Sequence, residues 1–253
     1  MATRTVTNSR NVAPTRSTAG RRLNMRSFGS SSFNWRGNTV EQRIVPTDLT
    51  PITLNATTDY SVGAWIHIKQ KTVTGDSDSH TFVNCNLNYG GNLGYEIQIR
   101  PIIGNLSFYS GNTNYLSGEN VVPYNKWCHI AFTLTGTTLK GYVNGALVWT
   151  QTITRKADSG NNEGKIGTES TGTGNVRRMA GQMSQFFSTK TLLTAEQIAD
   201  IYYDGKYPTL DIYYKLDEGT GASAVDSSGN GNTGTITGNS WSTNVPMTTR
   251  STV

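Results

Sequence analysis

Residues 124–149 limit the possible folds of this chain more than any other segment, because they contain three predicted strands and two tight turns in succession. Residues 127–134 alternate between two unlike sets of side chains, the period of two that a strand with two different faces requires. The dipeptide Asn144-Gly145 suits a type I′ turn, because both central residues of that turn take positive φ. The segment therefore predicts an antiparallel sheet.

The composition is typical of a protein built from many short strands. The chain has 253 residues, enough for one large β domain or two small ones, and its 27 glycines lie among Ser, Thr and Asn residues between the apolar runs. Cys85 and Cys128 lie in apolar alternation, which predicts two buried thiols, although the sequence leaves a disulfide open. The capping box Thr194-Ala-Glu-Gln197 predicts one short helix, with Gly205 just past its end.

The positive charge of the chain is concentrated at its N-terminal end. Residues 1–40 contain seven arginines, no lysine and no acidic residue, whereas residues 41–253 carry a net charge of −2. Such a polar segment cannot bury enough surface to offset the entropy cost of ordering, so residues 1–45 are predicted to form an extended basic arm that a partner holds in place. Guanidinium groups bind carboxylates and phosphates through paired hydrogen bonds. The predicted partner-binding residues of the arm are Arg4, Arg10, Arg16, Arg21, Arg22, Arg26 and Arg36.

No segment predicts export or insertion into a membrane. The chain has no apolar run near the roughly 20 residues that a membrane-spanning helix needs. The arginine-rich N-terminal segment also lacks the apolar region of a secretory signal. We therefore expect no membrane partner and synthesis in a cytoplasm.

Several segments resemble, in their order and spacing, the strands of the concanavalin A-like lectin/laminin G (LamG) domains. These segments are Tyr60-Ser-Val-Gly-Ala-Trp-Ile, Asn125-Lys-Trp-Cys-His-Ile-Ala-Phe-Thr, Leu139-Lys-Gly-Tyr-Val-Asn-Gly, Lys165-Ile-Gly, Gly181-Gln-Met-Ser-Gln-Phe-Phe and Leu193-Thr-Ala-Glu-Gln-Ile. The resemblance covers residues 55–240 approximately. It implies an all-β protein in which residues 46–253 form a two-sheet antiparallel jelly-roll sandwich with one short helix.

The C-terminal strand segment, residues 210–240, departs from the family pattern. Residues 213–232 resemble the segment that usually opens such a domain, yet here they come last. We expect this segment to close the same sandwich, as a circular permutation would, because chain termini often lie close together. The alternative is that it pairs with a neighbouring subunit in a domain swap.

The loop Asp226-Ser-Ser-Gly-Asn-Gly-Asn232 is the best candidate for a metal site. Calcium prefers carboxylate and carbonyl oxygens in a flexible loop, and LamG-like domains often hold a structural calcium in this region. The resemblance therefore implies Asp226 and Asn230 as calcium ligands. The alternative is that both side chains only make local turn hydrogen bonds. No cofactor is required in either case.

The sequence predicts no catalytic residues and therefore no enzyme. Glycosidases on this fold place two carboxylates in one cleft, and the chain has no Glu-x-Asp-x-Glu run that would do so. His67, His80 and His129 are scattered along predicted strands. There is also no nucleophile elbow and no phosphate-binding glycine loop before a helix.

Three functions remain. The leading hypothesis is a virion structural protein, because LamG-like domains occur in phage virion proteins and the arm needs a partner. It would be a bacteriophage capsid decoration, cement or fibre-base subunit, homo-oligomeric, anchored to the major capsid or another virion protein and exposing a domain to host glycans. The alternative is a soluble carbohydrate-binding module, with Trp65, Trp127 and Trp149 either stacking on sugars or packing in the core. The third is nucleic-acid packaging through the arm.

Overall fold

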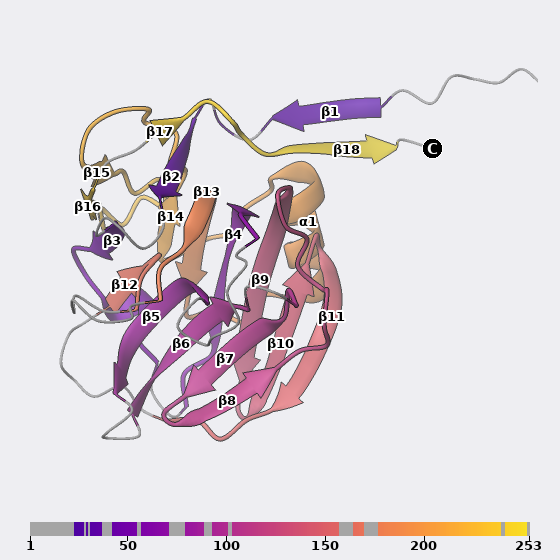
Figure 1. The fold of residues 1–253 in the computed structure, drawn as a ribbon, viewed down its shortest axis with the longest axis vertical. Helices are drawn as coiled ribbons and strands as arrows, with labels where there is room; N and C mark the ends of the chain where they lie inside the picture. The colour runs from indigo at the N-terminus through magenta and orange to yellow at the C-terminus, as the bar shows by residue number, and fades with distance from the viewer. Residues whose placement is uncertain are drawn as a thin grey trace, which may run out of the picture.

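The computed structural model describes residues 23–27, 29, 31–36, 42–54, 57–70, 79–88, 93–100, 103–156, 164–169, 177–238 and 241–251. Within these ranges the protein is built from strands, with one α-helix, α1 (Ala195–Asp204), and one 3-10 turn, η1 (Thr50–Ile52). Two large antiparallel sheets face each other, as Figure 1 shows, and a separate two-stranded ribbon lies beside them. The predicted two-sheet jelly-roll sandwich with one short helix is confirmed.

The first sheet has the strand order β11-β10-β9-β4-β13-β2-β17, and β14 also pairs with β13. Its strands are β2 (Ser32–Arg36), β4 (Tyr60–Ile68), β9 (Trp127–Thr135), β10 (Thr138–Val143), β11 (Ala146–Thr152), β13 (Ala180–Thr189), β14 (Ile212–Tyr214) and β17 (Trp241–Ser242). The predicted Asn144-Gly145 turn joins β10 to β11, with φ values of 51° and 78°.

The second sheet has the strand order β15-β16-β3-β12-β5-β6-β7-β8. Its strands are β3 (Arg43–Pro46), β5 (His80–Asn88), β6 (Leu93–Ile99), β7 (Leu106–Ser110), β8 (Thr113–Leu116), β12 (Gly164–Ile166), β15 (Ser223–Ala224) and β16 (Gly234–Thr237).

The main hydrophobic core fills the space between the two sheets. Every second residue of the central strands points into it, and Val62, Ile97 and Ile130 are completely buried there. The predicted buried thiols of Cys85 and Cys128 lie in the same core and are free. Burial of this apolar surface is the main force that holds the sheets together.

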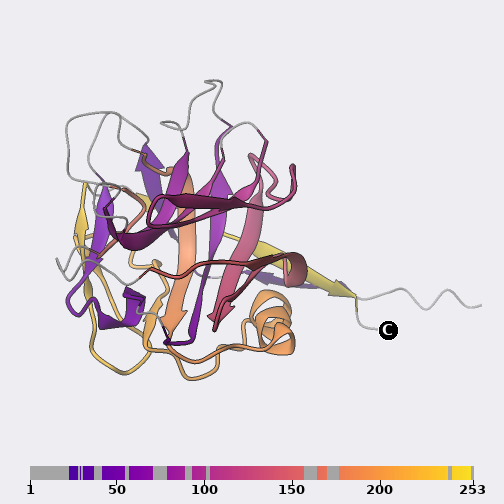
Figure 2. The same ribbon diagram turned by 90° about the horizontal axis from the view of Figure 1, so that it is seen from below.

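Helix α1 covers the outer face of the first sheet, where it forms a second apolar cluster (Figure 2). Ile198 and Ile201 of the helix pack there against Phe187 of β13. The predicted capping box is present, and Gly205 ends the helix with a φ of 55°. The helix fixes the position of the segment that follows it, residues 205–215, which borders the site described below.

The predicted boundary of the arm at residue 45 is too late in the chain. Strand β2 lies within the predicted arm and strand β3 begins in it, yet β2 pairs with β13 in the first sheet and β3 pairs with β16 in the second. The reason is that Phe33 and Ile44 are fully buried apolar residues of the sandwich core. The backbone of Arg36, predicted as an arm residue, therefore belongs to a sheet and pairs with Ala180.

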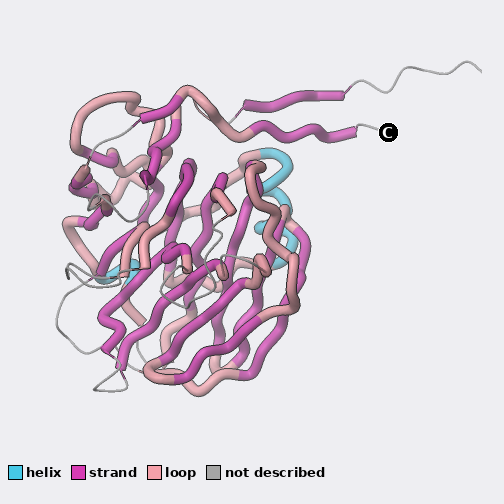
Figure 3. The backbone as a smooth tube through the Cα atoms, viewed as in Figure 1, coloured by secondary structure: helices cyan, strands magenta, loops and turns pink. Residues whose placement is uncertain are grey.

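The remaining arm residues divide into two groups. Arg26 belongs to β1 (Leu23–Ser27), which pairs only with β18 (Met247–Ser251) in the two-stranded ribbon that Figure 3 shows apart from the two sheets. Five of the predicted partner-binding residues lie outside the described residues, namely Arg4, Arg10, Arg16, Arg21 and Arg22. The role of the arm therefore stays a prediction.

The C-terminal segment adds strands to both sheets of its own chain. Strand β14 pairs with β13 of the first sheet, and β16 pairs with β3 of the second. The turn after β14 brings Asp226 back to form a bridge with Tyr214. Residues 210–240 thus connect the two layers at one edge of the sandwich.

Candidate functional site

The loop Asp226–Asn232 is organised around the carboxylate of Asp226. Its Oδ1 accepts hydrogen bonds from the backbone N–H groups of Tyr213 (3.0 Å) and Ser228 (2.9 Å). Its Oδ2 accepts from the Ser228 hydroxyl (2.8 Å) and from the N–H of Asn232 (2.9 Å). Burial alone would raise the pKa of Asp226, but these donated hydrogen bonds outweigh it and lower the pKa. The carboxylate is therefore held ionised and rigid.

Two asparagines of the same loop attach it to neighbouring segments. Asn230 donates from Nδ2 to the carbonyl oxygens of Leu210 (3.0 Å) and Asp211 (3.1 Å). Asn232 accepts from the N–H of Asp48 (2.7 Å) and donates to its carbonyl oxygen (2.7 Å). This paired contact joins positions that are 184 residues apart in the sequence.

An open hollow of about 440 Å³, called here the first hollow, lies beside these asparagines. Its lining residues come from four separate parts of the chain and are mostly of polar types: Thr47, Asp48, Thr50, Pro51, Lys190, Asp211, Asn230, Gly231 and Asn232. Its volume falls in the range of small-molecule sites, roughly 300–1,000 Å³.

The charged groups of the first hollow are held in place by the backbone. Asp48 accepts from the N–H of Thr50 (2.8 Å), and Asp211 accepts from the N–H of Lys190 (2.6 Å). The Lys190 ammonium donates to the carbonyl oxygen of Thr53 and lies 5.2 Å from the ring centre of Tyr60. The hollow therefore presents two oriented carboxylates and the oriented amide oxygen of Asn230, acceptors that suit the hydroxyl groups of a ligand.

A second hollow of about 610 Å³ lies on the other side of the loop. It is lined by Gly205, Tyr207, Pro208, Thr209, Leu210, Tyr213, Lys215, Ser227 and Ser228. The two hollows meet where Leu210 and Asp211 adjoin and where Asn230 donates to both of their carbonyl oxygens. Loop Asp226–Asn232 is therefore a wall shared by both hollows.

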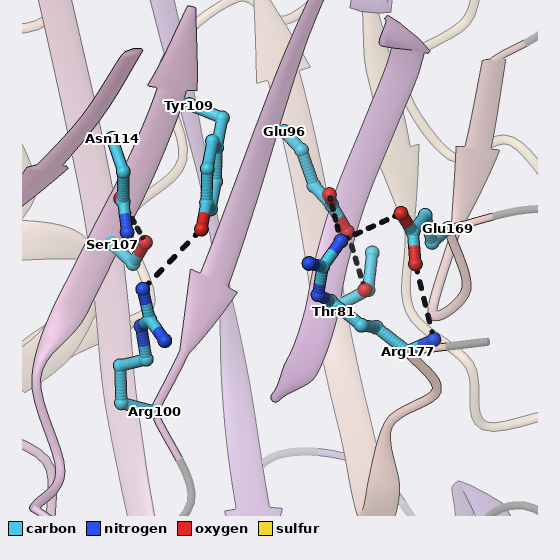
Figure 4. A network of polar contacts seen from close by, with 8 residues as sticks. All are labelled: Thr81, Glu96, Arg100, Ser107, Tyr109, Asn114, Glu169 and Arg177. Atoms are coloured by element: carbon cyan, nitrogen blue, oxygen red, sulfur yellow. Dashed lines mark hydrogen bonds and ion pairs between the residues drawn. The ribbon is translucent and has the colours of Figure 1, made fainter. Parts of the chain in front are cut away.

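A polar network covers the face of the second sheet that points away from the core (Figure 4). Glu96 of β6 accepts from the Thr81 hydroxyl of β5 (2.5 Å) and lies 3.9 Å from Arg177. Arg177 also forms an ion pair with Glu169 (2.6 Å), and its guanidinium lies 5.8 Å from the ring centre of Tyr109. The network ties the segments that flank β12 and β13 to the sheet.

Further along the same face the contacts are uncharged or singly charged. Arg100 donates to the hydroxyl of Tyr109 (3.3 Å), and Ser107 donates to Asn114 (2.7 Å), as Figure 4 shows.

Glu96 of this network is completely buried. Burial and the nearby Glu169 raise its pKa from 4.5 to about 8. Because solvent does not reach the Glu96 carboxyl group, this network acts on the stability of the sheet and is not an open binding surface.

The structure separates the sequence-predicted site residues into different roles. Asn230 lines the first hollow, whereas Asp226 supports the loop from within, with each of its oxygens accepting two hydrogen bonds. The calcium prediction stays untested, and the contacts around Asp226 are those of the local-turn alternative. Trp65 and Trp149 are buried in the sandwich, which leaves them no face for a sugar.

Sequence reasoning missed most of the residues that line the two hollows. Asp211 and Lys215 flank β14, and Tyr207 and Tyr213 lie in the same stretch, so a cluster of polar and aromatic residues was visible there. The alternation Glu96-Ile-Gln-Ile-Arg100 was likewise a signal for a polar outer face. Asp48 gave no signal, because its position depends on a contact with a distant loop.

The fold and its edge hollows define the protein as a lectin-like β-sandwich. The chain belongs to the concanavalin A-like lectin/glucanases superfamily, whose family model matches residues 44–199. No curated protein matches the chain. Among the described residues, no helix is long and apolar enough to cross a membrane.

Three solved structures have a similar fold. A candidate carbohydrate-binding protein from Bacteroides ovatus superposes with a TM-score of 0.62 at 18% identity, covering 85% of this chain and 60% of that protein. The heptameric SAP-like pentraxin from Limulus polyphemus gives a TM-score of 0.50 at 14% identity, with coverage of 87% and 93%. The binding domain of Paraclostridial mosquitocidal protein 1 gives 0.50 at 17% identity, with coverage of 74% and 49%. At these identities the similarity establishes the fold alone.

Proposed function

We propose that this domain binds carbohydrate in the first hollow and does not alter it chemically. The observation that carries the proposal is the set of oriented oxygen acceptors there: the carboxylates of Asp48 and Asp211 and the Oδ1 of Asn230, whose Nδ2 is fixed by its bonds to Leu210 and Asp211. Sugar hydroxyls donate to carboxylates and exchange hydrogen bonds with amides. Groups that are already fixed lose little entropy when a ligand binds.

Two further findings support this assignment. The family is that of concanavalin A-like lectins and glucanases. The protein from Bacteroides ovatus with the same fold is itself a candidate carbohydrate-binding protein. The proposal that the domain is not an enzyme rests on the sequence, which has no Glu-x-Asp-x-Glu run to place a nucleophile and an acid close together on one strand.

The test is a glycan array followed by calorimetric titration of the best neutral oligosaccharide. Asp211→Asn removes the charge and keeps an oxygen that can accept from Lys190. We expect it to weaken binding about tenfold or more, because a hydrogen bond to a charged group contributes about 1.5–3 kcal/mol. Glu119→Gln, which makes the same charge change on an exposed residue outside the hollow, is the matched control. An empty array, or equal affinities for both variants, would contradict the proposal.

A second proposed role belongs to the arginine-rich segment. Seven arginines without any acid in residues 1–40 suit an acidic surface, so we propose that this segment anchors the domain in an assembly, with a bacteriophage virion as the leading candidate. The test is co-sedimentation with capsids at two salt concentrations. Replacing the five arginines of residues 1–22 by glutamine should abolish the salt-sensitive part of the binding. Binding that is unaffected by this replacement would rule out the anchoring role.

A further inference from the structure

The second hollow differs from the first in the chemistry of its lining. Its lining residues include no acid, and Lys215 is the only charged one. The first hollow, by contrast, contains two carboxylates and one ammonium. The two sites therefore favour different ligands, although they share the wall formed by loop Asp226–Asn232.

Two half-buried tyrosines form an aromatic floor in the second hollow. The rings of Tyr207 and Tyr213 pack against each other, 4.3 Å apart from centre to centre and with 31° between their planes, so a ligand can contact only the part of this pair that the packing leaves uncovered. Tyr207 is supported from behind by Phe187, at 5.9 Å, and the hydroxyl of Tyr213 donates to Gln185. These contacts fix both rings before any ligand arrives. An aromatic surface of this kind accepts the apolar face of a sugar ring.

The ammonium of Lys215 is the group in the second hollow that would favour a negatively charged ligand. The Lys215 residue is exposed, and within the described part of the chain its ammonium forms no ion pair. Its main chain is held firmly, because its carbonyl oxygen accepts from the N–H of Gln185 (3.0 Å) and from the hydroxyl of Ser184 (3.2 Å). A ligand carboxylate would therefore meet a positive charge that has no competing partner.

The backbone around Lys215 is unusual. Gln185, opposite it on β13, has a φ of 56°, and Leu216, the next residue, has a φ of 57°. Positive φ is costly for a side chain as large as leucine, and such strain persists only where the surrounding structure imposes it. The positive φ of Gln185 coincides with a bulge in β13, and there the Gln185 side chain accepts from the hydroxyl of Tyr213. Strain of this kind concentrates at ligand sites, which agrees with the assignment below.

We propose that the second hollow binds the carboxylate-bearing residue of an acidic oligosaccharide. The sugar ring packs against the uncovered side of the Tyr207–Tyr213 pair, its carboxylate contacts the ammonium of Lys215, and its hydroxyls reach Ser227 and Thr209 at the rim. The class of ligand rests on the carbohydrate-binding function proposed above, but the site does not require that the first hollow be occupied.

The hydrogen bonds of the loop favour a carboxylate over a phosphate. Phosphate sites in proteins usually offer several free backbone N–H groups. Here the N–H of Ser227 donates to Tyr213, and the N–H of Ser228 donates to Asp226. The partly buried negative charge of Asp226 behind Ser228 also opposes a doubly charged group. The single ammonium of Lys215 matches one carboxylate of the ligand, and the tyrosine pair matches the sugar ring that carries this carboxylate.

The experiment compares hexuronate tetramers with their methyl esters, which keep the same rings and lose the charge. Calorimetric titration measures each pair on the wild-type chain, on Lys215→Gln and on the control Lys126→Gln, an exposed lysine outside both hollows. We expect at least one acid to bind the wild-type and control chains tenfold or more tightly than its ester. In Lys215→Gln that preference should disappear. Equal affinity for acid and ester, or an unchanged preference in Lys215→Gln, overturns the proposal.

A second pair of variants tests the aromatic floor. Tyr207→Phe keeps the ring and should keep acid binding, whereas Tyr207→Ala removes the ring and should weaken acid and ester alike. If Tyr207→Ala binds the acid as the wild type does, the floor is not part of the site and the proposal is wrong. If a single-stranded oligonucleotide displaces the acid and its binding also depends on Lys215, the hollow is a phosphate site and the proposal is overturned.

Asp211→Asn separates this proposal from the general one. It should weaken binding of a neutral oligosaccharide in the first hollow and leave the preference for acid over ester unchanged. Neutral binding without any preference for acids would refute the second-hollow assignment alone. No binding of either kind would refute both.

Discussion

Two fully buried ionisable groups should give this protein a stability plateau in mildly acidic solution. Burial and the charge of Glu169 raise the pKa of Glu96 from 4.5 to about 8. Burial lowers the pKa of His129 from 6.5 to about 3. His129 lies among aromatic rings, with Trp65 at 5.6 Å and Phe187 at 6.1 Å between ring centres. The two groups respond to pH in opposite directions.

The native state keeps a proton on Glu96 that the unfolded chain releases. Its contribution to stability is therefore complete below pH 4.5 and is lost as the pH rises through about 8. For His129, the unfolded chain binds a proton at a pH at which the buried ring stays neutral. The contribution of His129 to the free energy of unfolding is therefore complete above pH 6.5 and is lost as the pH falls toward about 3.

Between pH 4.5 and pH 6.5 both effects operate and cancel. Each changes the free energy of unfolding by about 1.4 kcal/mol per pH unit, so each amounts to about 3 kcal/mol across this interval. The free energy of unfolding of the wild-type chain should therefore change little between pH 4.5 and pH 6.5. In His129→Phe only the Glu96 effect remains, and stability should increase by about 3 kcal/mol as the pH falls from 6.5 to 4.5. In Glu96→Gln stability should decrease by the same amount.

Urea unfolding followed by tryptophan fluorescence at several pH values measures these differences. Glu119→Gln and His67→Gln serve as controls and should follow the wild-type curve. The reasoning would be refuted if the free energy of unfolding of His129→Phe and of Glu96→Gln stayed constant in this interval, or if it changed in the same direction in both variants. It would also fail if the wild-type chain showed no loss of stability between pH 6.5 and pH 8, where the Glu96 effect alone should cost about 2 kcal/mol.

Three further changes have expected outcomes. Asp226→Ala removes the acceptor of four hydrogen bonds and should lower stability by about 3 kcal/mol in thermal unfolding, with Asp226→Asn in between; equal stability for both would contradict the organising role of this side chain. Gly63→Ala would place a Cβ 2.7 Å from the carbonyl oxygen of Ile130 and the ring of Phe187, so it should cost about 1–3 kcal/mol, measured by urea unfolding, and a neutral result would show that β4 can shift. Thr194→Ala removes the helix cap and should cost about 1 kcal/mol in the same assay, whereas Thr194→Ser should cost little.

The local features of the sequence predicted the corresponding local structures well. The Asn144-Gly145 turn, the capping box before α1 and the buried positions of Cys85 and Cys128 all follow from a few neighbouring residues. Each of these features depends on local backbone geometry or on the alternation of side chains along a single strand. Such local properties can be recognised in the sequence without knowledge of the rest of the fold. The antiparallel strands could be predicted for the same reason, whereas the two-sheet jelly roll was implied by the resemblance to the LamG domains.

The arm shows where this reasoning stops. Its composition predicted an extended segment through residue 45. The apolar residues Phe33 and Ile44 within it suggested docking on the domain, but not that each belongs to a strand of the sandwich. Such strands gain stability only from partners that lie far along the chain, β13 for one and β16 for the other. A local average cannot register a partner that is distant in sequence.

The sequence by itself therefore determined a β-sandwich of the lectin type, and it indicated the loop that begins at Asp226 as a site of interest. Only the tertiary structure decided what that loop does. It turned the Asp226 carboxylate inward to four hydrogen-bond donors, and it brought Asp48 against Asn232 across 184 residues of sequence. The physical reason is that a binding hollow is formed by segments that only the packing of two sheets places side by side.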